Sequence, residues 1–401
     1  MSVRPNTCRT NEKSDGMEIP SGTGLYIQVP FCPERCDYCA IPVSSSQSMI
    51  KDYLDALERE LARVRPYLSK NPPLSLYFGG GSPTSLPENE FVYLVNMFST
   101  YFQQIFEVTI ESRPEALTTQ IVEQLQGVPH LRLSLGVESL DSASLTALGR
   151  NAPMLSPLAL LERIKSCLTA QVSMDFICTG EDFDVDRFLA TAESLREGGL
   201  DHLSVYPLVI EKKTVLSLRK DQGRTEEELE DRAAENWRQV CEGLVRQGWL
   251  RYEVSNFARD PERICRHNLH VWRGGDYVGL GPGAHQKIDG VRCENVRSVV
   301  EYVSIVRNES RHPFAAKEGL SARDRDVEFL YTNLRLFGGI PVRWILSRTN
   351  PRQGRAVIDD IVRNGLGMIS RTDYEALVLT GEGLFLLDEV ASRILACFSD
   401  D

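Results

Sequence analysis

The sequence lacks the features that mark membrane-spanning, secreted or nucleic-acid-binding proteins. No uninterrupted apolar run reaches the roughly 20 residues of a membrane span, and the polar first 20 residues lack the apolar core of a signal peptide. The 45 Lys and Arg are outnumbered by 56 Asp and Glu, and a net charge of −11 argues against nonspecific nucleic-acid binding. We therefore expect a cytoplasmic protein with no transmembrane span, no nucleic-acid partner and a flexible tail at residues 1–20.

The sequence also lacks the cysteine pattern of a disulfide-bonded protein. Seven of the ten cysteines stand singly, at positions 8, 167, 178, 241, 265, 293 and 397. In a reducing cytosol such residues mostly serve as small core hydrophobes. The other three, Cys32, Cys36 and Cys39, have the spacing of metal ligands, but the fourth ligand that zinc and cubane iron–sulfur sites usually take is missing. Ile41 stands where a fourth thiolate could follow.

The first half of the chain alternates apolar runs with helical patterns. Six runs predict strands, which begin near residues 25, 74, 106, 131, 172 and 202. Several are continuously apolar, as in a parallel sheet covered by helices. Helical patterns lie between them, near 48–64, 88–102, 116–125, 141–148, 157–168 and 185–196. Six strand–helix repeats predict an α/β barrel or an open doubly wound sheet over residues 21–220.

The second half divides into two further predicted segments. Residues 221–315 contain a long helical pattern, followed at 251–290 by a Gly- and His-rich stretch that we expect to be irregular and to close the barrel mouth. Residues 316–401 predict a mostly helical domain with one hairpin, which resembles a winged helix. That fold often binds DNA, but the chain from Lys317 onward has 11 Lys and Arg against 13 Asp and Glu, which argues against such a role.

The three-cysteine loop directly follows the first predicted strand, where α/β folds place reactive groups. A cubane cluster held by three thiolates leaves one iron open, and the amino and carboxylate groups of S-adenosylmethionine (SAM) suit that position. The alternatives are a zinc knuckle or an accidental group of cysteines. Three glycines, Gly79 to Gly81, follow the second predicted strand and would let a ligand approach the backbone closely.

These motifs resemble the radical SAM superfamily. The cysteine loop, "YFGGGSPT", "LSLGVESL", "HLSVYPLVIE" and "RHNLHVWRGGDYVGLGPGAH" are together similar to the oxygen-independent coproporphyrinogen III oxidase family, and most similar to its HemW branch of heme chaperones. The resemblance runs from about Gly24 to Phe398. It implies a partial (β/α)6 barrel with a C-terminal winged-helix-like domain, a [4Fe–4S] cluster on the three cysteines, and SAM.

The resemblance also assigns site residues. Those that match the first SAM site are Tyr26, Tyr38, Gly80, Gly81, Ser82 and Glu111. Glu138, Arg150 and Asp175 match contacts to a second SAM in the oxidases, although Glu138 stands where the oxidases carry glutamine. A carboxylate in place of an amide changes the local electrostatics and argues against a second SAM. Alternatively, Arg150 and Asp175 pair with each other at the barrel mouth.

A further motif concerns heme. The chaperones carry H-N-x-x-Y-W, and here His267, Asn268 and Trp272 match while Val271 replaces the tyrosine. Imidazole is a natural axial ligand of heme iron, so the resemblance implies His267 as a heme ligand in a Gly-rich loop. The alternatives are His270, Cys265 or a purely structural histidine.

The sequence leaves two main functions open, and a radical reaction on a different substrate as a third. The first is a heme chaperone that binds cluster, SAM and heme and passes heme to acceptor proteins, with delivery at a membrane face as one route. The second is an oxygen-independent coproporphyrinogen III oxidase, a radical enzyme of porphyrin biosynthesis whose ligand is a porphyrinogen. Ile41 and Glu138 both depart from the oxidase pattern and favour the chaperone.

Overall fold

The computed structural model describes residues 22–151, 155–180, 183–219, 226–308, 311–371 and 374–399. The tail predicted at residues 1–20 lies outside the described residues. No helix among the described residues is both long and apolar enough to cross a membrane.

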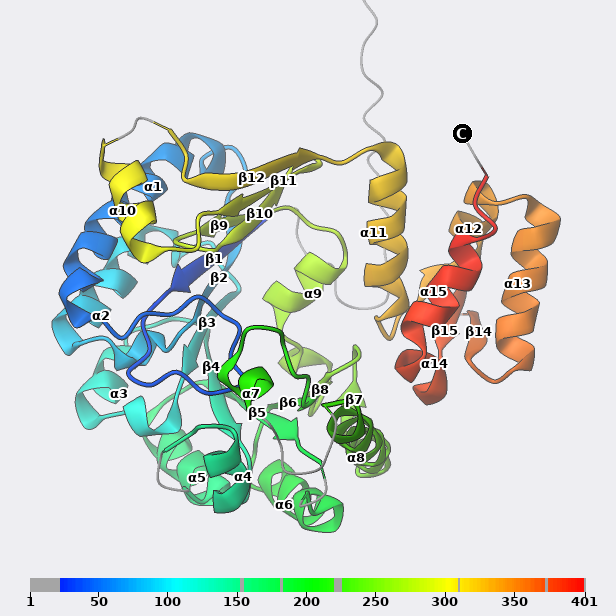
Figure 1. Cartoon of the computed structure of the whole chain (residues 1–401), viewed down its shortest axis with the longest axis horizontal. Helices are drawn as coiled ribbons and strands as arrows, with labels where there is room; N and C mark the ends of the chain where they lie inside the picture. The colour runs from blue at the N-terminus through cyan, green and yellow to red at the C-terminus, as the bar shows by residue number, and fades with distance from the viewer. Residues whose placement is uncertain are drawn as a thin grey trace, which may run out of the picture.

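A curved parallel sheet forms the centre of the molecule (Figure 1). Six strands pair in chain order, each parallel to the next: β1 (Thr23–Val29), β2 (Pro73–Gly80), β3 (Glu107–Ser112), β4 (Leu131–Glu138), β5 (Gln171–Cys178) and β6 (His202–Pro207). All six predicted strands are therefore present, and their carboxyl ends share one edge.

The helices that connect these strands pack on the outer face of the sheet (Figure 1). They are α1 (Ile50–Leu68), α2 (Glu88–Met97), α3 (Thr119–Leu125), α4 (Ser142–Ala147), α5 (Pro157–Cys167) and α6 (Val185–Glu197), and α8 (Glu226–Arg246), which follows β6, packs beside α6. The short helix α7 (Val215–Leu218) instead contacts the cysteine loop: the N–H of Leu216 donates to the carbonyl of Asp37 at 2.8 Å. The apolar face predicted for the first helix is buried, from Ile50 to Val64.

The strands have one apolar and one polar face. On β1, Leu25, Ile27 and Val29 are fully buried against the helices, while Tyr26 and Gln28 point to the inner face. Successive side chains of a strand point to opposite faces, so the same alternation holds along the sheet. The inner face of the other strands carries Ser75, Tyr77, Glu107, Glu111, Arg132, Ser134, Ser173, Asp175 and His202. The inside of this partial barrel is therefore polar, which a purely structural barrel core would not be.

The stretch predicted to be irregular, residues 251–290, is mostly ordered secondary structure. It contributes β7 (Leu250–Arg251), β8 (Asn256–Ala258), α9 (Arg266–Trp272), β9 (Tyr277–Leu280) and β10 (His285–Ile288), followed by β11 (Val291–Asn295), α10 (Val299–Asn308) and β12 (Phe314–Gly319). β9 pairs parallel to β1, and the complete sheet order is β12-β11-β10-β9-β1-β2-β3-β4-β5-β6-β8-β7. The prediction failed because these strands are too short to show a periodic sequence pattern. They are stabilised by pairing with neighbouring strands of the sheet, which the local sequence does not reveal.

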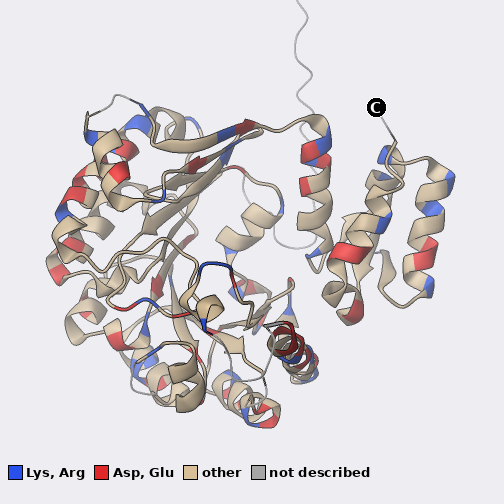
Figure 2. Cartoon of the chain, in the orientation of Figure 1, with Lys and Arg blue, Asp and Glu red and all other residues tan. Residues whose placement is uncertain are grey.

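The C-terminal part has a separate hydrophobic core and a small antiparallel sheet (Figure 1). Its elements are α11 (Ala322–Leu334), β13 (Ile340–Pro341), α12 (Val342–Arg348), α13 (Pro351–Arg363), β14 (Gly367–Arg371), β15 (Glu375–Leu379), α14 (Gly381–Phe385) and α15 (Leu387–Leu395). β14 and β15 form the predicted hairpin. Three of these helices, α11, α13 and α15, carry both Arg and Asp or Glu (Figure 2).

Candidate functional site

The three clustered cysteines lie in the loop that follows β1. The loop is anchored to the chain around it: the backbone N–H of Cys32 donates to the carbonyl of Ser44 at 3.2 Å, and that of Asp37 donates to Leu148 at 2.9 Å. Within the loop, the N–H of Cys39 donates to the carbonyl of Cys36 at 3.2 Å. All three thiols are free and half-buried. The loop therefore presents its cysteines at the carboxyl edge of the sheet, as predicted.

A cavity of about 420 Å³ opens at this edge and collects most of the predicted site residues. Its lining includes the three cysteines together with Tyr38, Gly80, Gly81, Glu111, Glu138, Arg150 and Asp175. Ile41 also lines it, together with the apolar side chains of Val43, Ile177, Leu208 and Val209. The ends of six successive strands, β1 to β6, and the segments that follow them thus supply one cavity with both polar and apolar lining residues.

The glycine segment runs directly beside the cysteine loop. The N–H of Gly81 donates to the carbonyl of Val29 at 2.9 Å, at the end of β1. Gly80 has a φ of +99°, and a Cβ at this position would lie 2.3 Å from Nε2 of Gln28. A Cβ at Gly81 would lie 2.3 Å from the carbonyl oxygen of Phe31. Only glycine fits at either position, so the backbone itself forms this wall of the cavity.

Glu111 connects the ends of β2 and β3. Its Oε1 accepts from the hydroxyl of Tyr77 at 2.8 Å, and its Oε2 accepts from the backbone N–H of Gly80 at 3.0 Å. Burial raises the pKa of Glu111 to about 7, although both hydrogen bonds oppose the rise. Each carboxylate oxygen has further acceptor capacity. Glu111 can therefore accept a hydrogen bond from a ligand amine or hydroxyl while it holds the glycine segment.

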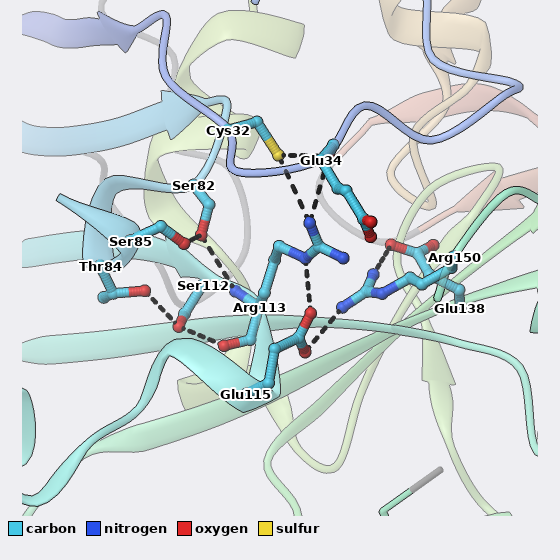
Figure 3. Close-up of polar contacts among 10 residues, drawn as sticks. All are labelled: Cys32, Glu34, Ser82, Thr84, Ser85, Ser112, Arg113, Glu115, Glu138 and Arg150. Carbon is cyan, nitrogen blue, oxygen red and sulfur yellow. Dashed lines mark hydrogen bonds and ion pairs between the residues drawn. The ribbon is translucent and has the colours of Figure 1, made fainter. Parts of the chain in front are cut away.

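Three charged side chains of the cavity, Arg113, Glu138 and Arg150, form a chain of ion pairs together with the neighbouring Glu115 (Figure 3). Nη1 of Arg150 lies 2.8 Å from Oε1 of Glu138, and its Nη2 lies 3.3 Å from Oε2 of Glu115. Nε of Arg113 lies 2.6 Å from the other oxygen of Glu115. The alternative pair of Arg150 with Asp175 is wrong: Asp175 instead accepts from the hydroxyl of Ser134 at 3.0 Å.

Glu138 has a backbone conformation that is rare for its residue type. Its φ is +68°, and it occupies an irregularity between β4 and β5. Such strain is costly and persists only where surrounding contacts determine it. Here the ion pair with Arg150 supplies that contact. In the region assigned to a second SAM, the charges of Glu138 and Arg150 therefore pair with each other.

Three predicted site residues do not line the cavity. The hydroxyl of Tyr26 donates to Oε1 of Gln28 at 2.7 Å on the inner face of β1. Ser82 is buried, and its hydroxyl oxygen accepts from the hydroxyl of Ser85 at 2.8 Å. The third, His267, lies deeper in the barrel.

His267 belongs to helix α9, not to a Gly-rich loop as predicted. Its Nδ1 lies 2.9 Å from the hydroxyl of Ser75, and its ring packs against Tyr77 at 5.0 Å between ring centroids. The carboxylate of Glu107 accepts from the backbone N–H groups of Arg266 and His267, and thereby caps the helix. Burial lowers the pKa of His267 to about 3, so the imidazole is neutral at physiological pH. The two alternative heme ligands, His270 and Cys265, are also buried.

The donor set of the cavity fits an iron–sulfur cluster better than a single metal ion. Among the described residues, no three His, Cys, Asp or Glu side chains converge as they would around one ion. A cubane cluster distributes its cysteine ligands over separate irons, so its thiolates stand apart. Three thiols around one cavity, beside a wall that only glycine fits, are compatible with a cluster and a ligand next to it.

Comparison with known proteins agrees with this geometry. Residues 26–211 match the model of the radical SAM superfamily. A protein named heme chaperone HemW from Mycobacterium tuberculosis is 30% identical over 381 residues, which cover 93% of this chain and 94% of that protein. The chain belongs to the HemW family of radical SAM proteins. The HemW protein of Bacillus subtilis is 28% identical over 92% of this chain and 98% of its own length.

A solved structure shares the fold of this chain. The coproporphyrinogen III oxidase HemN of Escherichia coli matches with a TM-score of 0.74 and 19% identity, over 93% of this chain and 90% of that one. The predicted α/β architecture, a partial barrel with a helical C-terminal part, is therefore confirmed. Membership of the radical SAM superfamily implies a [4Fe–4S] cluster and SAM.

Three residues of the candidate site were not assigned from the sequence: Tyr77, Arg113 and Glu115. Each contacts a predicted residue from the inner face or from a strand end. The signal was alternation along the strands. Tyr77 precedes Gly79 by two positions and Arg113 follows Glu111 by two, so both share a face with a predicted residue.

Proposed function

We propose that this protein holds a [4Fe–4S] cluster and SAM in the cavity at the carboxyl ends of β1 to β6, and that it carries heme to acceptor proteins in the cytoplasm. Cys32, Cys36 and Cys39 would hold the cluster, while the glycine segment and Glu111 would hold SAM. The cluster, when bound, supplies an open iron for SAM. The observation that carries the proposal is the 30% identity to a protein named heme chaperone, over nearly the full length of both chains.

Two features of the cavity support the chaperone over an oxidase. Ile41 lines the cavity, and the oxidase pattern has a further cysteine at this position. Glu138 and Arg150 pair at 2.8 Å in the place where the oxidase pattern has a second SAM. A ligand there would have to separate a largely buried ion pair, which costs several kcal/mol when one partner is left unpaired.

His267 has the chemistry of an axial heme ligand but lies in a closed environment. Its ring is neutral, and its Nδ1 is oriented by the hydroxyl of Ser75, as metal-binding imidazoles are oriented by a second contact. Only 6% of His267 is exposed. Heme would reach this imidazole only after α9 moves. We therefore expect the rate of heme binding to be below the diffusion limit and to be set by the movement of α9.

The test is anaerobic reconstitution followed by two assays on the same sample. Heme titration should give a saturable Soret band, and coproporphyrinogen III should remain unconverted in the presence of SAM and a reductant. His267→Gln should lose or shift the Soret band, whereas His202→Gln, which changes another buried imidazole of the barrel, should retain it. Absence of heme binding by the wild type, together with conversion of coproporphyrinogen, would establish the oxidase instead.

A further inference from the structure

Arg113 extends from the end of β3 into the wall of the cluster cavity. Side chains alternate along a strand, so Arg113 shares the inner side with Glu111, two residues earlier. Its backbone N–H donates to the hydroxyl oxygen of Ser82 at 3.4 Å. One strand end thus supplies both the carboxylate beside the glycine segment and a cation beside the cysteine loop.

The guanidinium of Arg113 has three partners (Figure 3). Its Nη1 lies 3.6 Å from Sγ of Cys32 and 3.2 Å from the carbonyl oxygen of Glu34. Its Nε pairs with Glu115, which in turn pairs with Arg150. These contacts hold the side chain in one orientation, and only 11% of it is exposed.

Ligation of iron changes what the sulfur of Cys32 can do. As a thiol it donates to the carbonyl of Glu34 at 2.9 Å. As a thiolate on iron it has no proton and only accepts, so Arg113 becomes its donor. A second arginine of the loop, Arg35, differs: its Nε and Nη2 donate to the carbonyl oxygen of Cys39 and not to a sulfur.

Hydrogen bonds to cysteine sulfurs and nearby positive charge both stabilise the reduced, more negative state of an iron–sulfur cluster. We propose that Arg113 donates a charged hydrogen bond to the cluster-bound sulfur of Cys32, and that this contact raises the reduction potential of the cluster. Arg113 is a positioning residue: it acts on the cluster through a cysteine ligand. The inference rests on the proposed cluster.

The hydrogen bond differs from a general charge effect in a way that can be measured. Arg35 is exposed, so solvent screens its charge, whereas the side chain of Arg113 is largely buried. Arg35→Gln therefore serves as a control for the loss of a charge from the loop without the loss of a sulfur contact. Arg113→Lys separates charge from the sulfur contact, because it keeps a positive charge at this position but not the guanidinium fork.

The experiment compares wild type, Arg113→Gln and Arg35→Gln after anaerobic reconstitution. Arg113 also borders a second hollow of about 700 Å³. Glutamine preserves most of the side-chain volume, so the substitution should not open a passage between this hollow and the cavity. The readouts are iron content, the midpoint potential from an EPR-monitored titration with dithionite, and the unfolding temperature of the apo-protein. We expect Arg113→Gln to have the lowest potential of the three proteins, with Arg35→Gln close to the wild type.

A potential in Arg113→Gln that is no lower than in Arg35→Gln overturns the inference. Arg113→Lys tests the sulfur contact apart from the charge, and it also provides the comparison if Arg113→Gln unfolds at a lower temperature as the apo-protein. It retains the charge but lacks the fork that reaches Glu115 and Cys32 together, and it too should have a lowered potential. An unchanged potential in Arg113→Lys then overturns the inference. Failure of the wild type to bind about four irons is a separate result, which removes the proposed cluster itself.

Discussion

The buried carboxylate of Glu60 should make the stability of this protein depend on pH. Glu60 lies on α1 and is 2% exposed. It accepts hydrogen bonds from the N–H of Gly281 at 2.8 Å, the amide of Asn295 at 2.8 Å and the hydroxyl of Tyr302 at 2.6 Å. These bonds fix the Gly281 turn, which lies against Gln28 on β1. Glu60 therefore supports the strand from which the cluster loop begins.

The sign of the effect follows from the direction of the pKa change. Burial raises the pKa of Glu60 to about 7 from an ordinary 4.5, although the three donors oppose the rise. The protonated form is favoured in the folded state. The contribution of protonated Glu60 to the free energy of unfolding is therefore fully present below about pH 4.5 and is lost as the pH rises through 7. At 1.36 kcal/mol per pKa unit, the loss between pH 5 and pH 8 is about 2 to 3 kcal/mol.

The variant Glu60→Gln isolates this effect because its amide does not ionise. At pH 5 we expect it to be about 1 to 2 kcal/mol less stable than the wild type. Both oxygens of Glu60 accept hydrogen bonds, so the N–H₂ group of the glutamine would face a donor and lack an acceptor. The difference should shift by about 2 to 3 kcal/mol in favour of the variant by pH 8. Urea unfolding of the apo-protein at several pH values measures it, with Glu162→Gln on the exposed face of α5 as the matched control. A constant difference between Glu60→Gln and wild type from pH 5 to pH 8 would refute the reasoning.

Three further predictions concern the site and the C-terminal part. Cys36→Ser should reduce the iron content of the reconstituted protein well below four per chain, and retention of a full cluster would contradict the ligand assignment. Gly80→Ala should abolish the perturbation of the cluster's EPR signal by SAM while the iron content stays normal, because its Cβ would lie 2.3 Å from Gln28 at a φ of +99°; Gly127→Ala, whose Cβ would meet only a carbonyl at 3.7 Å, is the control. The full-length protein should show no salt-sensitive shift of DNA at physiological ionic strength, because Lys and Arg do not exceed Asp and Glu from Lys317 onward; a shift that weakens with added salt would show this expectation to be wrong.

The sequence by itself determined the local structure and the ends of the strands. Apolar periodicity located the six parallel strands and the helices between them, since burial of one face imposes a period of 2 or 3.6. The spacing of Cys32, Cys36 and Cys39 and the adjacent glycines identified the cavity edge, because the carboxyl ends of successive parallel strands meet there. These features depend on residues that are close in the chain, and they could be predicted.

The tertiary structure alone decided which distant side chains meet. Arg150 contacts Glu138 and Glu115 rather than Asp175, and Arg113 contacts Cys32 from a strand 81 positions later. His267 lies on a helix that Glu107 caps from β3, so the imidazole is buried beside Ser75. The reason is that charge pairing and capping depend on distances of a few ångströms between packed elements. Sequence periodicity fixes the face on which a residue lies but not the partner that it faces there.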